Sequence, residues 1–255
     1  GGLNRWGGQV AQEFLPELRG LRGVKVYEEM RKNDPVVGAM LRATRHVIEG
    51  VHWDVECDDE KTKEFIEGCM DDMSHSWTTF IGDVTTFLPF GWAYFEVVYK
   101  VRSGEDTDPS SSYNDGKLGW RKVALRGQDS LASWMLDENG GIQGMKQIAP
   151  PDYRPREIPI TKALLFRIDA ERNNPEGTSL LRVAYRPWYF KKNLEEVEGI
   201  GIERDFTGVP VIKVPNTAGE AEKAAALDIL ERLKSDEQAG VMLVKGNAAD
   251  GRLDW

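Results

Sequence analysis

The sequence predicts an α+β fold, and three features of its 255 residues support this prediction. Residues 34–50 and 66–88 carry apolar side chains at helical spacing. Residues 91–101 are rich in aromatic and β-branched side chains on both faces, which is typical of a central strand. A long helical stretch, 178–206, separates this region from a short strand–helix–strand pattern near the C-terminus. We therefore expect an α/β domain, a long kinked helix and a small second α/β domain.

The first elements follow from capping and periodicity. Residues 1–23, rich in glycine and arginine, are expected to form an arm or loop. Asp34 and Pro35 predict a helix start, because an N-cap acid precedes a proline at the first helical position. Gly50 ends this helix. The apolar residues Val51, Trp53 and Val55 alternate with polar ones and predict a half-buried strand.

Further along, the helical period of 66–88 is interrupted at 74–76, which indicates two helices, and Pro89 and Gly91 end it. After the central strand and a polar loop, a strand is expected at 120–126. A hairpin follows, with Asn139-Gly140 at its turn. Another short strand is expected at 163–168. Beyond the long helix, 209–215 and 240–246 read as strands around a helix.

The long helix has two unusual features. Pro187 lies inside it, where a proline costs about 3 kcal/mol. Its bases also precede its acids, the reverse of the order that the helix dipole favours: Arg182, Arg186, Lys191 and Lys192 come before Glu195, Glu196, Glu198, Glu203 and Asp205. Ion pairs within the helix contribute only a few tenths of a kcal/mol each. We therefore expect contacts outside the helix, with its own domain or with a neighbouring copy in a ring.

Composition limits the classes of function. The chain is 40% hydrophobic and 29% charged, as expected for a globular protein, and its net charge is −9. A protein that binds nucleic acid through phosphates usually has the opposite sign, so simple electrostatic DNA binding is disfavoured, although contact with DNA is not excluded. Cys57 and Cys69 are expected to be free thiols. We expect a soluble protein made inside the cell, and a fragment of a longer chain.

The sequence contains no phosphate-binding loop, nucleophile elbow or zinc-protease motif. Four carboxylates, those of Asp58, Asp59, Asp71 and Asp72, could hold Mg²⁺ in a nuclease-like site. The first pair, however, lies where the next helix needs an N-cap, and capping is the preferred interpretation. We expect no catalytic residue, cofactor or metal ion. The alternatives are a metal-dependent nucleic-acid-processing enzyme and a monomeric α+β binding module.

Three stretches resemble a known family: "DPVVGAMLRATRHVIEGVHWDVE", "FGWAYFEVVYK" and "RNNPEGTSLLRVAYRPWYFKKNLEEVEGIGIERDFTGVPVIKVP". In order and residue type, they are similar to the portal proteins of tailed bacteriophages, and above all to the branch named for the phage Mu portal. The resemblance covers residues 25–246.

The resemblance implies a non-enzymatic ring, usually of twelve subunits, at one capsid vertex of the virion. Double-stranded DNA would pass through its channel without sequence specificity during genome packaging and ejection. The implied partners are the terminase motor, a head–tail adaptor, and the major capsid and scaffolding proteins; no membrane is involved. The protein would be made in the host cytoplasm and would act as the head–tail connector.

By the same resemblance, residues 1–24 would be an arm, 25–176 a wing, 177–207 a stem helix and 208–255 a clip. The returning stem helix, tunnel loop and crown would follow residue 255. The candidates for lining the channel are Glu195, Glu196, Glu198, Glu203, Lys191 and Lys192. Arg182, Arg186 and Trp188 are candidates for subunit contacts, and Pro187 for a helix kink. The clip candidates are Val209, Val211, Lys213, Val241, Leu243 and Lys245.

Overall fold

The structure is a computed structural model that describes residues 3, 5–207, 211–215, 217–232 and 242–246. The chain divides into two compact units, residues 1–185 and 186–255. Helices and sheets occur in both units, so the predicted α+β class is confirmed.

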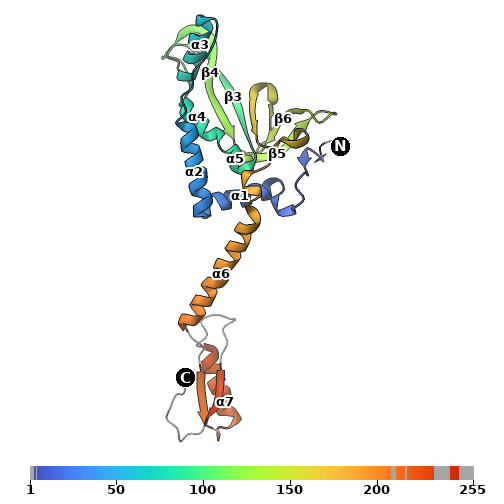
Figure 1. Cartoon of the computed structure of the whole chain (residues 1–255), viewed down its shortest axis with the longest axis vertical. Helices are drawn as coiled ribbons and strands as arrows, with labels where there is room; N and C mark the ends of the chain where they lie inside the picture. Colours follow the sequence, from blue (N-terminus) through green and yellow to red (C-terminus); the bar gives the residue numbers. More distant parts are fainter. Residues whose placement is uncertain (1–2, 4, 208–210, 216, 233–241, 247–255) are drawn as a thin grey trace. The chain divides into compact units, whose positions relative to one another are not determined.

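The first unit begins with a short hairpin and continues with helices (Figure 1). Its N-terminal elements are β1 (Arg5–Trp6), β2 (Gln9–Val10), η1 (Pro16–Leu18), α1 (Gly20–Asn33), α2 (Pro35–Glu49), α3 (Glu60–Asp71), α4 (Trp77–Val84) and α5 (Phe87–Phe90). The elements that follow are β3 (Trp92–Ser103), β4 (Asn114–Arg126), η2 (Gln128–Ser130), β5 (Leu131–Leu136), β6 (Ile142–Gln147), β7 (Arg156–Pro159), η3 (Ile160–Lys162), β8 (Ala163–Arg167), η4 (Glu171–Asn173) and η5 (Leu180–Arg182).

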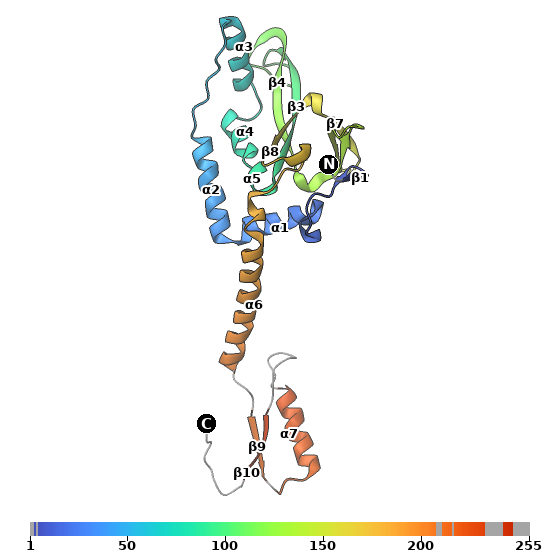
Figure 2. The ribbon, with the colours of Figure 1, turned by 45° about the vertical axis from the view of Figure 1, so that its right-hand side comes forward.

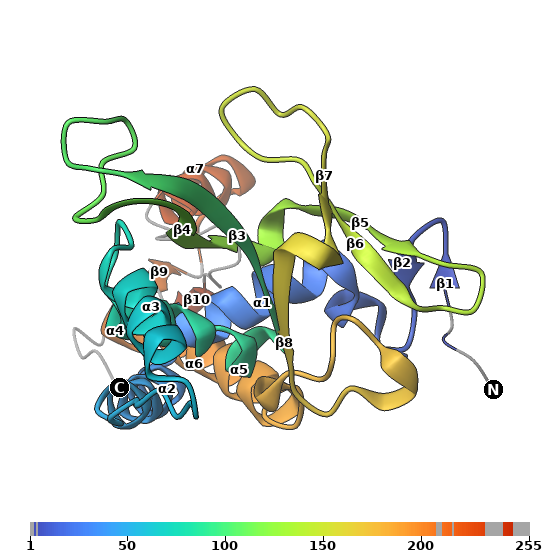
Figure 3. The ribbon, with the colours of Figure 1, turned by 90° about the horizontal axis from the view of Figure 1, so that it is seen from above.

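Two antiparallel sheets of the first unit meet around β3. One has the strand order β4–β3–β8 and the other the order β5–β6–β7. Seen from above, β5, β6 and β7 lie to one side of the β3–β4 ribbon, and α4 lies to the other (Figure 3). The first four residues of β3, 92–95, are all buried. The predicted central strand is therefore confirmed.

The alternation of side chains along β3 creates two cores. Trp92 and Tyr94 pack with Trp134 and other residues of the β5–β6–β7 sheet. Ala93 and Phe95 point to the opposite face and pack with α4. The first residues of one strand thus join the two halves of the unit.

The predicted caps and the predicted helix break are present. The carboxylate of Asp34 accepts hydrogen bonds from the amides of Val36 and Val37, at 2.9 and 3.0 Å, at the start of α2. Between α3 and α4, the hydroxyl of Ser76 accepts one from the amide of Thr79 at 3.1 Å. These local interactions account for the correct boundaries.

One expectation was wrong, and two further elements were not predicted. Residues 51–55 form no strand, since no described strand lies beside them to accept their hydrogen bonds. The expected arm contains the β1–β2 hairpin and the start of α1, whose buried residues Gly23, Tyr27 and Met30 follow helical spacing. The proline-rich segment before residue 160 contains the unpredicted β7, in which Pro159 ends the strand.

The second unit contains most of α6 (Tyr185–Thr207), then β9 (Val211–Pro215), α7 (Glu220–Arg232) and β10 (Met242–Gly246). Strands β9 and β10 are parallel, and α7 lies beside them (Figure 2). A helix between parallel strands is the usual crossover in such a pair. The predicted strand–helix–strand pattern is confirmed.

Candidate functional site

The long helix begins later than expected, at Tyr185 rather than near residue 177. The preceding residues are held by the first unit instead. The hydroxyl of Ser179 donates a hydrogen bond to the carbonyl of Pro89 at 2.6 Å and accepts one from the amide of Leu181 at 3.0 Å. Leu181 is buried. This side-chain capping competes with helix formation and delays the helix start.

The late start changes the interpretation of Pro187. It is the third residue of α6 and lies in the first turn. The amides of the first turn have no acceptor within their own helix, so a proline there removes no helical hydrogen bond. Pro187 therefore lies at the start of the helix and not in its interior, and the kink stays a prediction.

The charges of α6 are sorted by the helical repeat into rows. Lys192, Glu196, Gly199 and Glu203 follow one another at i, i+4, i+7 and i+11. We call this row the charged face. Lys191, Glu195 and Glu198 form a second row, in which Lys191 and Glu195 are ion-paired at 3.7 Å.

A third row of α6 is apolar. It contains Phe190, Leu194, Val197 and Gly201, again at i, i+4, i+7 and i+11. We call this row the apolar face. Every residue from 194 to 203 is exposed, including Leu194, Val197 and Ile200. A helix with an exposed apolar face needs a partner to exclude water from it.

The three candidates for subunit contacts differ in their surroundings. Arg182 is half-buried and ion-paired with Glu13 of the same chain. Arg186 is exposed, and its guanidinium lies 5.8 Å from the ring centre of Phe190. Trp188 is half-buried, with the ammonium group of Lys192 at 5.7 Å from its ring. The charge of Arg182 is thus already compensated within the first unit.

The clip candidates are described in part. Val211 and Lys213 are exposed on β9. Leu243 and Lys245 lie on β10, where they pair with Ile212 and Val214. Val209 and Val241 lie outside the described residues.

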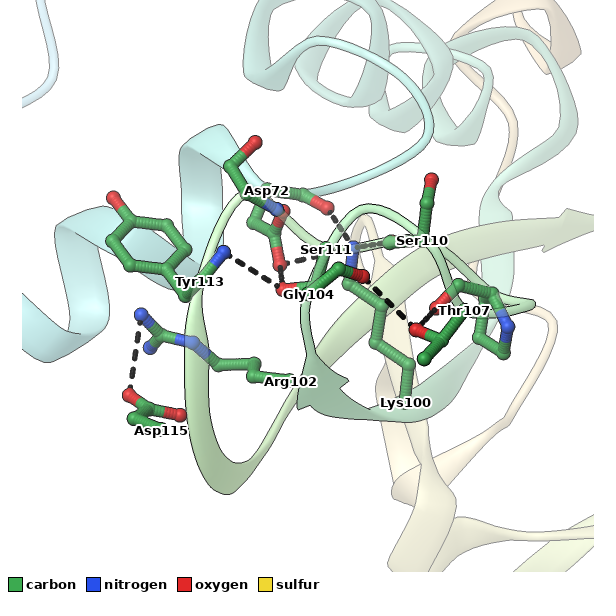
Figure 4. A network of polar contacts seen from close by, with 11 residues as sticks. Asp72, Lys100, Arg102, Gly104, Thr107, Ser110, Ser111, Tyr113 and Asp115 are labelled. Carbon is green, nitrogen blue, oxygen red and sulfur yellow. Dashed lines mark hydrogen bonds and ion pairs between the residues drawn. The ribbon is translucent and has the colours of Figure 1, made fainter.

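The carboxylate of Asp72, a candidate metal ligand, is instead saturated by protein contacts (Figure 4). It accepts hydrogen bonds from the Ser111 hydroxyl at 2.6 Å and the Ser112 amide at 2.9 Å, and Lys100 Nζ lies 2.9 Å from its Oδ2. Burial raises the pKa of Asp72, but these contacts outweigh burial and the pKa is lowered. The network joins the end of α3 to β3 and to the 104–113 loop.

The other carboxylates give no support to a metal site. Asp59 caps α3 by accepting a hydrogen bond from the amide of Thr62 at 3.1 Å, as the capping interpretation predicts. Asp58 and Asp71 are exposed. Among the described residues, no three His, Cys, Asp or Glu side chains are arranged to hold a metal ion.

Glu176 is a half-buried acid that sequence reasoning missed. It lines a cavity of about 240 Å³ with Tyr27, Arg182 and residues of the N-terminal segment. Burial raises its pKa to about 7, against the opposing effect of a hydrogen bond from the Trp134 indole at 3.1 Å. Because it lies in a proline- and glycine-containing turn, no sequence pattern indicated burial.

Comparisons with known proteins agree on one family. A family model described as "Portal protein of Mu bacteriophage" matches residues 24–246. A chain in the virion of a native gene transfer agent particle is similar, with 10% identity, a TM-score of 0.52, and coverage of 91% of this chain and 59% of that one.

A second similar chain comes from the neck of an empty gene transfer agent particle computed with C6 symmetry. It has 12% identity, a TM-score of 0.52, and coverage of 91% of this chain and 60% of that one. At these identities the likeness concerns the fold. The present chain spans about three fifths of the length of both. None of its described helices is long and apolar enough to cross a membrane.

Proposed function

The chain belongs to the portal protein family of bacteriophage Mu, and from this premise we propose that it forms a ring-shaped DNA channel at one capsid vertex. The ring has twelve copies, and the C6 symmetry of the similar neck structure is compatible with that number. Genome packaging by the terminase motor and genome ejection both use the channel. A head–tail adaptor and the major capsid and scaffolding proteins bind the same ring, which is made in the host cytoplasm and has no enzymatic activity.

The observation that carries this proposal is the exposed helix α6, which has an apolar row opposite its charged face. Its apolar face (Phe190, Leu194, Val197 and Gly201) packs against neighbouring copies. Its charged face, with Glu196, Glu203 and Lys192, lines the channel, and Glu195 lies beside it. An acidic wall repels phosphates, which keeps DNA of any sequence mobile. Glu198 and Lys191 lie in the second row, away from the centre of the charged face.

In domain terms, we propose that residues 25–176 form the wing, 177–207 the stem and 208–255 the clip. The wing and clip lie at the two ends of the stem segment in the sequence. Val211 and Lys213 are exposed on the clip's first strand and are available to the adaptor or the terminase.

The first test is the mass of the purified full-length protein at physiological salt, with electron micrographs of the same sample. Closed rings of about twelve copies with a central hole are expected. A protein that stays monomeric at full length would contradict the proposal. Divalent-metal-dependent nuclease activity in such a monomer would favour the enzyme alternative.

The second test reverses charges on α6 in assembled particles. Glu196→Lys and Glu203→Lys place bases on the charged face, so DNA is retarded and the yield of genome-filled particles falls. The loss should lessen at higher salt, because each new phosphate contact is screened. Glu198→Lys is the matched control in the second row. Equal losses from all three variants would contradict the assignment of the charged face.

A further inference from the structure

The outer side of α2 carries an apolar stripe with no partner. Val36, Met40, Ala43 and Val47 follow one another at i, i+4, i+7 and i+11. Val36, Met40 and Val47 are 66%, 65% and 72% exposed, and no residue of α2 is buried. The half-buried Val37, Leu41 and Ile48 lie on the other side of the helix, and Ile48 packs against the core under α4. The helix therefore has two apolar sides, and its own unit uses only one.

A second bare apolar surface lies on the β3–β4 ribbon. Tyr99 pairs with Trp120, and Val101 with Leu118, in register across the two strands. Directly opposed residues project from the same face of an antiparallel pair. Tyr99, Val101 and Leu118 are 44%, 52% and 60% exposed. We call these four residues the ribbon patch.

The ribbon patch continues a face that a helix already covers. Nearer the start of β3, Phe80 and Ile81 of α4 pack on Phe95 and Val123, and Trp120 borders the same core. Helix α4 has only 8 residues, whereas β3 has 12, so the far part of this face is left open. The opposite face is covered, because Arg102 is buried against Phe65 of α3 and Tyr113.

The α2 stripe and the ribbon patch cannot meet within one copy. In both Figure 2 and Figure 3, α4 lies between α2 and the β3–β4 ribbon. In a ring, however, each copy presents two different surfaces to its two neighbours. A helix with an apolar stripe is also the kind of partner that this strand face accepts within the chain itself.

A base lies beside the α2 stripe, and acids lie in the loop beyond the ribbon patch, where Glu105 and Asp108 line a cavity with Lys100 and Arg121. Exposed Arg42 lies beside the α2 stripe and makes no ion pair with another described residue, whereas His46 lies 3.4 Å from Glu49 of the same helix. The loop at the tip of the ribbon carries exposed Glu105, Asp106 and Asp108, again without an ion pair among the described residues. Such rim charges steer and orient association.

We propose that the α2 stripe of one copy packs on the ribbon patch of the next copy around the ring. This inference rests on the proposed ring and names one of its contacts. The contact completes, between copies, the helix-on-sheet layer that α4 begins within each copy.

Disulfide cross-linking of assembled full-length rings tests this contact. In a Cys57→Ser background, Met40→Cys or Val47→Cys is combined with Val101→Cys or Leu118→Cys, and the rings are mildly oxidised. At least one combination should give a ladder from dimers up to the closed ring on a non-reducing gel. Each single cysteine should give no ladder. The combination of Met40→Cys with Glu64→Cys, an exposed position on α3, is the matched control.

The outcomes separate the two proposals. Rings that form without a ladder in any combination would overturn this contact and leave the ring intact. Dimers from Met40→Cys alone, at the yield of the double variant, would indicate an α2–α2 contact and would also overturn it. A protein that forms no ring would contradict the proposed function itself.

A second variant tests the same contact without cysteines. Met40→Asp with Val47→Asp should lower the fraction of protein in rings by about tenfold or more at a fixed concentration. The monomer's melting temperature should stay unchanged, because both side chains are exposed. Trp6→Asp, which alters an exposed apolar residue on neither surface, should leave assembly unaffected. An undiminished ring fraction in the double variant would overturn the contact.

Discussion

Arg182 and Glu13 form a bidentate ion pair between the segment before α6 and the N-terminal segment. Arg182 Nε and Nη2 donate to the two carboxylate oxygens of Glu13 at 2.5 and 2.9 Å. The guanidinium also lies 5.1 Å from the ring centre of Phe14. Residues 169 positions apart in the sequence are thus joined where the long helix begins.

Arg182→Ala should destabilise the first unit by about 2 kcal/mol, because it leaves a half-buried carboxylate without its charged partner. Burial raises the pKa of Glu13, but the bonds from Arg182 and the Leu15 amide outweigh it, and the pKa is lowered from 4.5. The ion pair therefore stabilises the fold fully above pH 4.5, the usual pKa of a glutamate. This stabilisation is lost as the pH falls through the lowered pKa of Glu13 in the folded protein. Urea unfolding at pH 7 and pH 3 measures this. Arg182→Lys keeps the charge but cannot donate to both carboxylate oxygens in the same way, so its loss of stability should be smaller than that of Arg182→Ala. A loss that is equal at both pH values would contradict the ion-pair explanation.

Lys100→Met should be far more damaging than Ser111→Ala. The first variant leaves Asp72 buried and charged without its cation, at a cost of about 3–5 kcal/mol. The second removes one neutral donor, at a cost of about 1 kcal/mol. Chemical unfolding followed by tryptophan fluorescence compares them.

The double variant Asp72→Asn with Lys100→Met is the control for the Asp72–Lys100 pair. It should recover part of the lost stability, because neither partner then remains as an isolated charge. Equal costs for Lys100→Met and Ser111→Ala would show that the pair does not stabilise this corner of the unit.

Glu176→Gln should stabilise the protein at pH 8 and have little effect near pH 4.5. Burial raises the folded-state pKa of Glu176 to about 7 from 4.5. The protonated acid therefore favours folding. This stabilisation is lost as the pH rises from the pKa of the unfolded chain, 4.5, through the pKa of the folded protein, about 7. The gain at pH 8 is up to about 3 kcal/mol.

Melting temperatures at the two pH values measure the effect of Glu176→Gln. Glu171→Gln, at an exposed position near the same cavity, is the matched control. A shift of the same size at pH 4.5 and pH 8 would show that packing, rather than ionisation, is responsible.

Gly91→Ala should cost several kcal/mol and Gly116→Ala only about 1–2. Both glycines have positive φ, 87° and 68°. A Cβ on Gly91 would lie 2.6 Å from the Glu176 carbonyl oxygen and 2.9 Å from the Ser179 amide nitrogen, whereas one on Gly116 meets no atom within 4 Å. Unfolding free energies of the two variants separate crowding from backbone strain. Equal losses would contradict the close approach at Gly91.

The sequence by itself determined the elements that depend on neighbouring residues. The start of α2 follows from Asp34 and Pro35, and the α3–α4 break from the capping residue Ser76. The burial of residues 92–95 of β3 on both faces follows from their uninterrupted apolar run. Local hydrogen bonds and side-chain spacing determine these elements. The order of such elements was enough to indicate the family.

Only the tertiary structure decided what depends on distant partners. Val51, Trp53 and Val55 have a strand pattern but no neighbouring strand. Asp72 is buried and ion-paired because Lys100 of β3 and Ser111 of the 104–113 loop contact its carboxylate. Helix α6 starts late because Ser179 is bound to Pro89. Each outcome depends on whether hydrogen bonds form between residues far apart in the chain. Periodicity and local spacing do not determine those contacts.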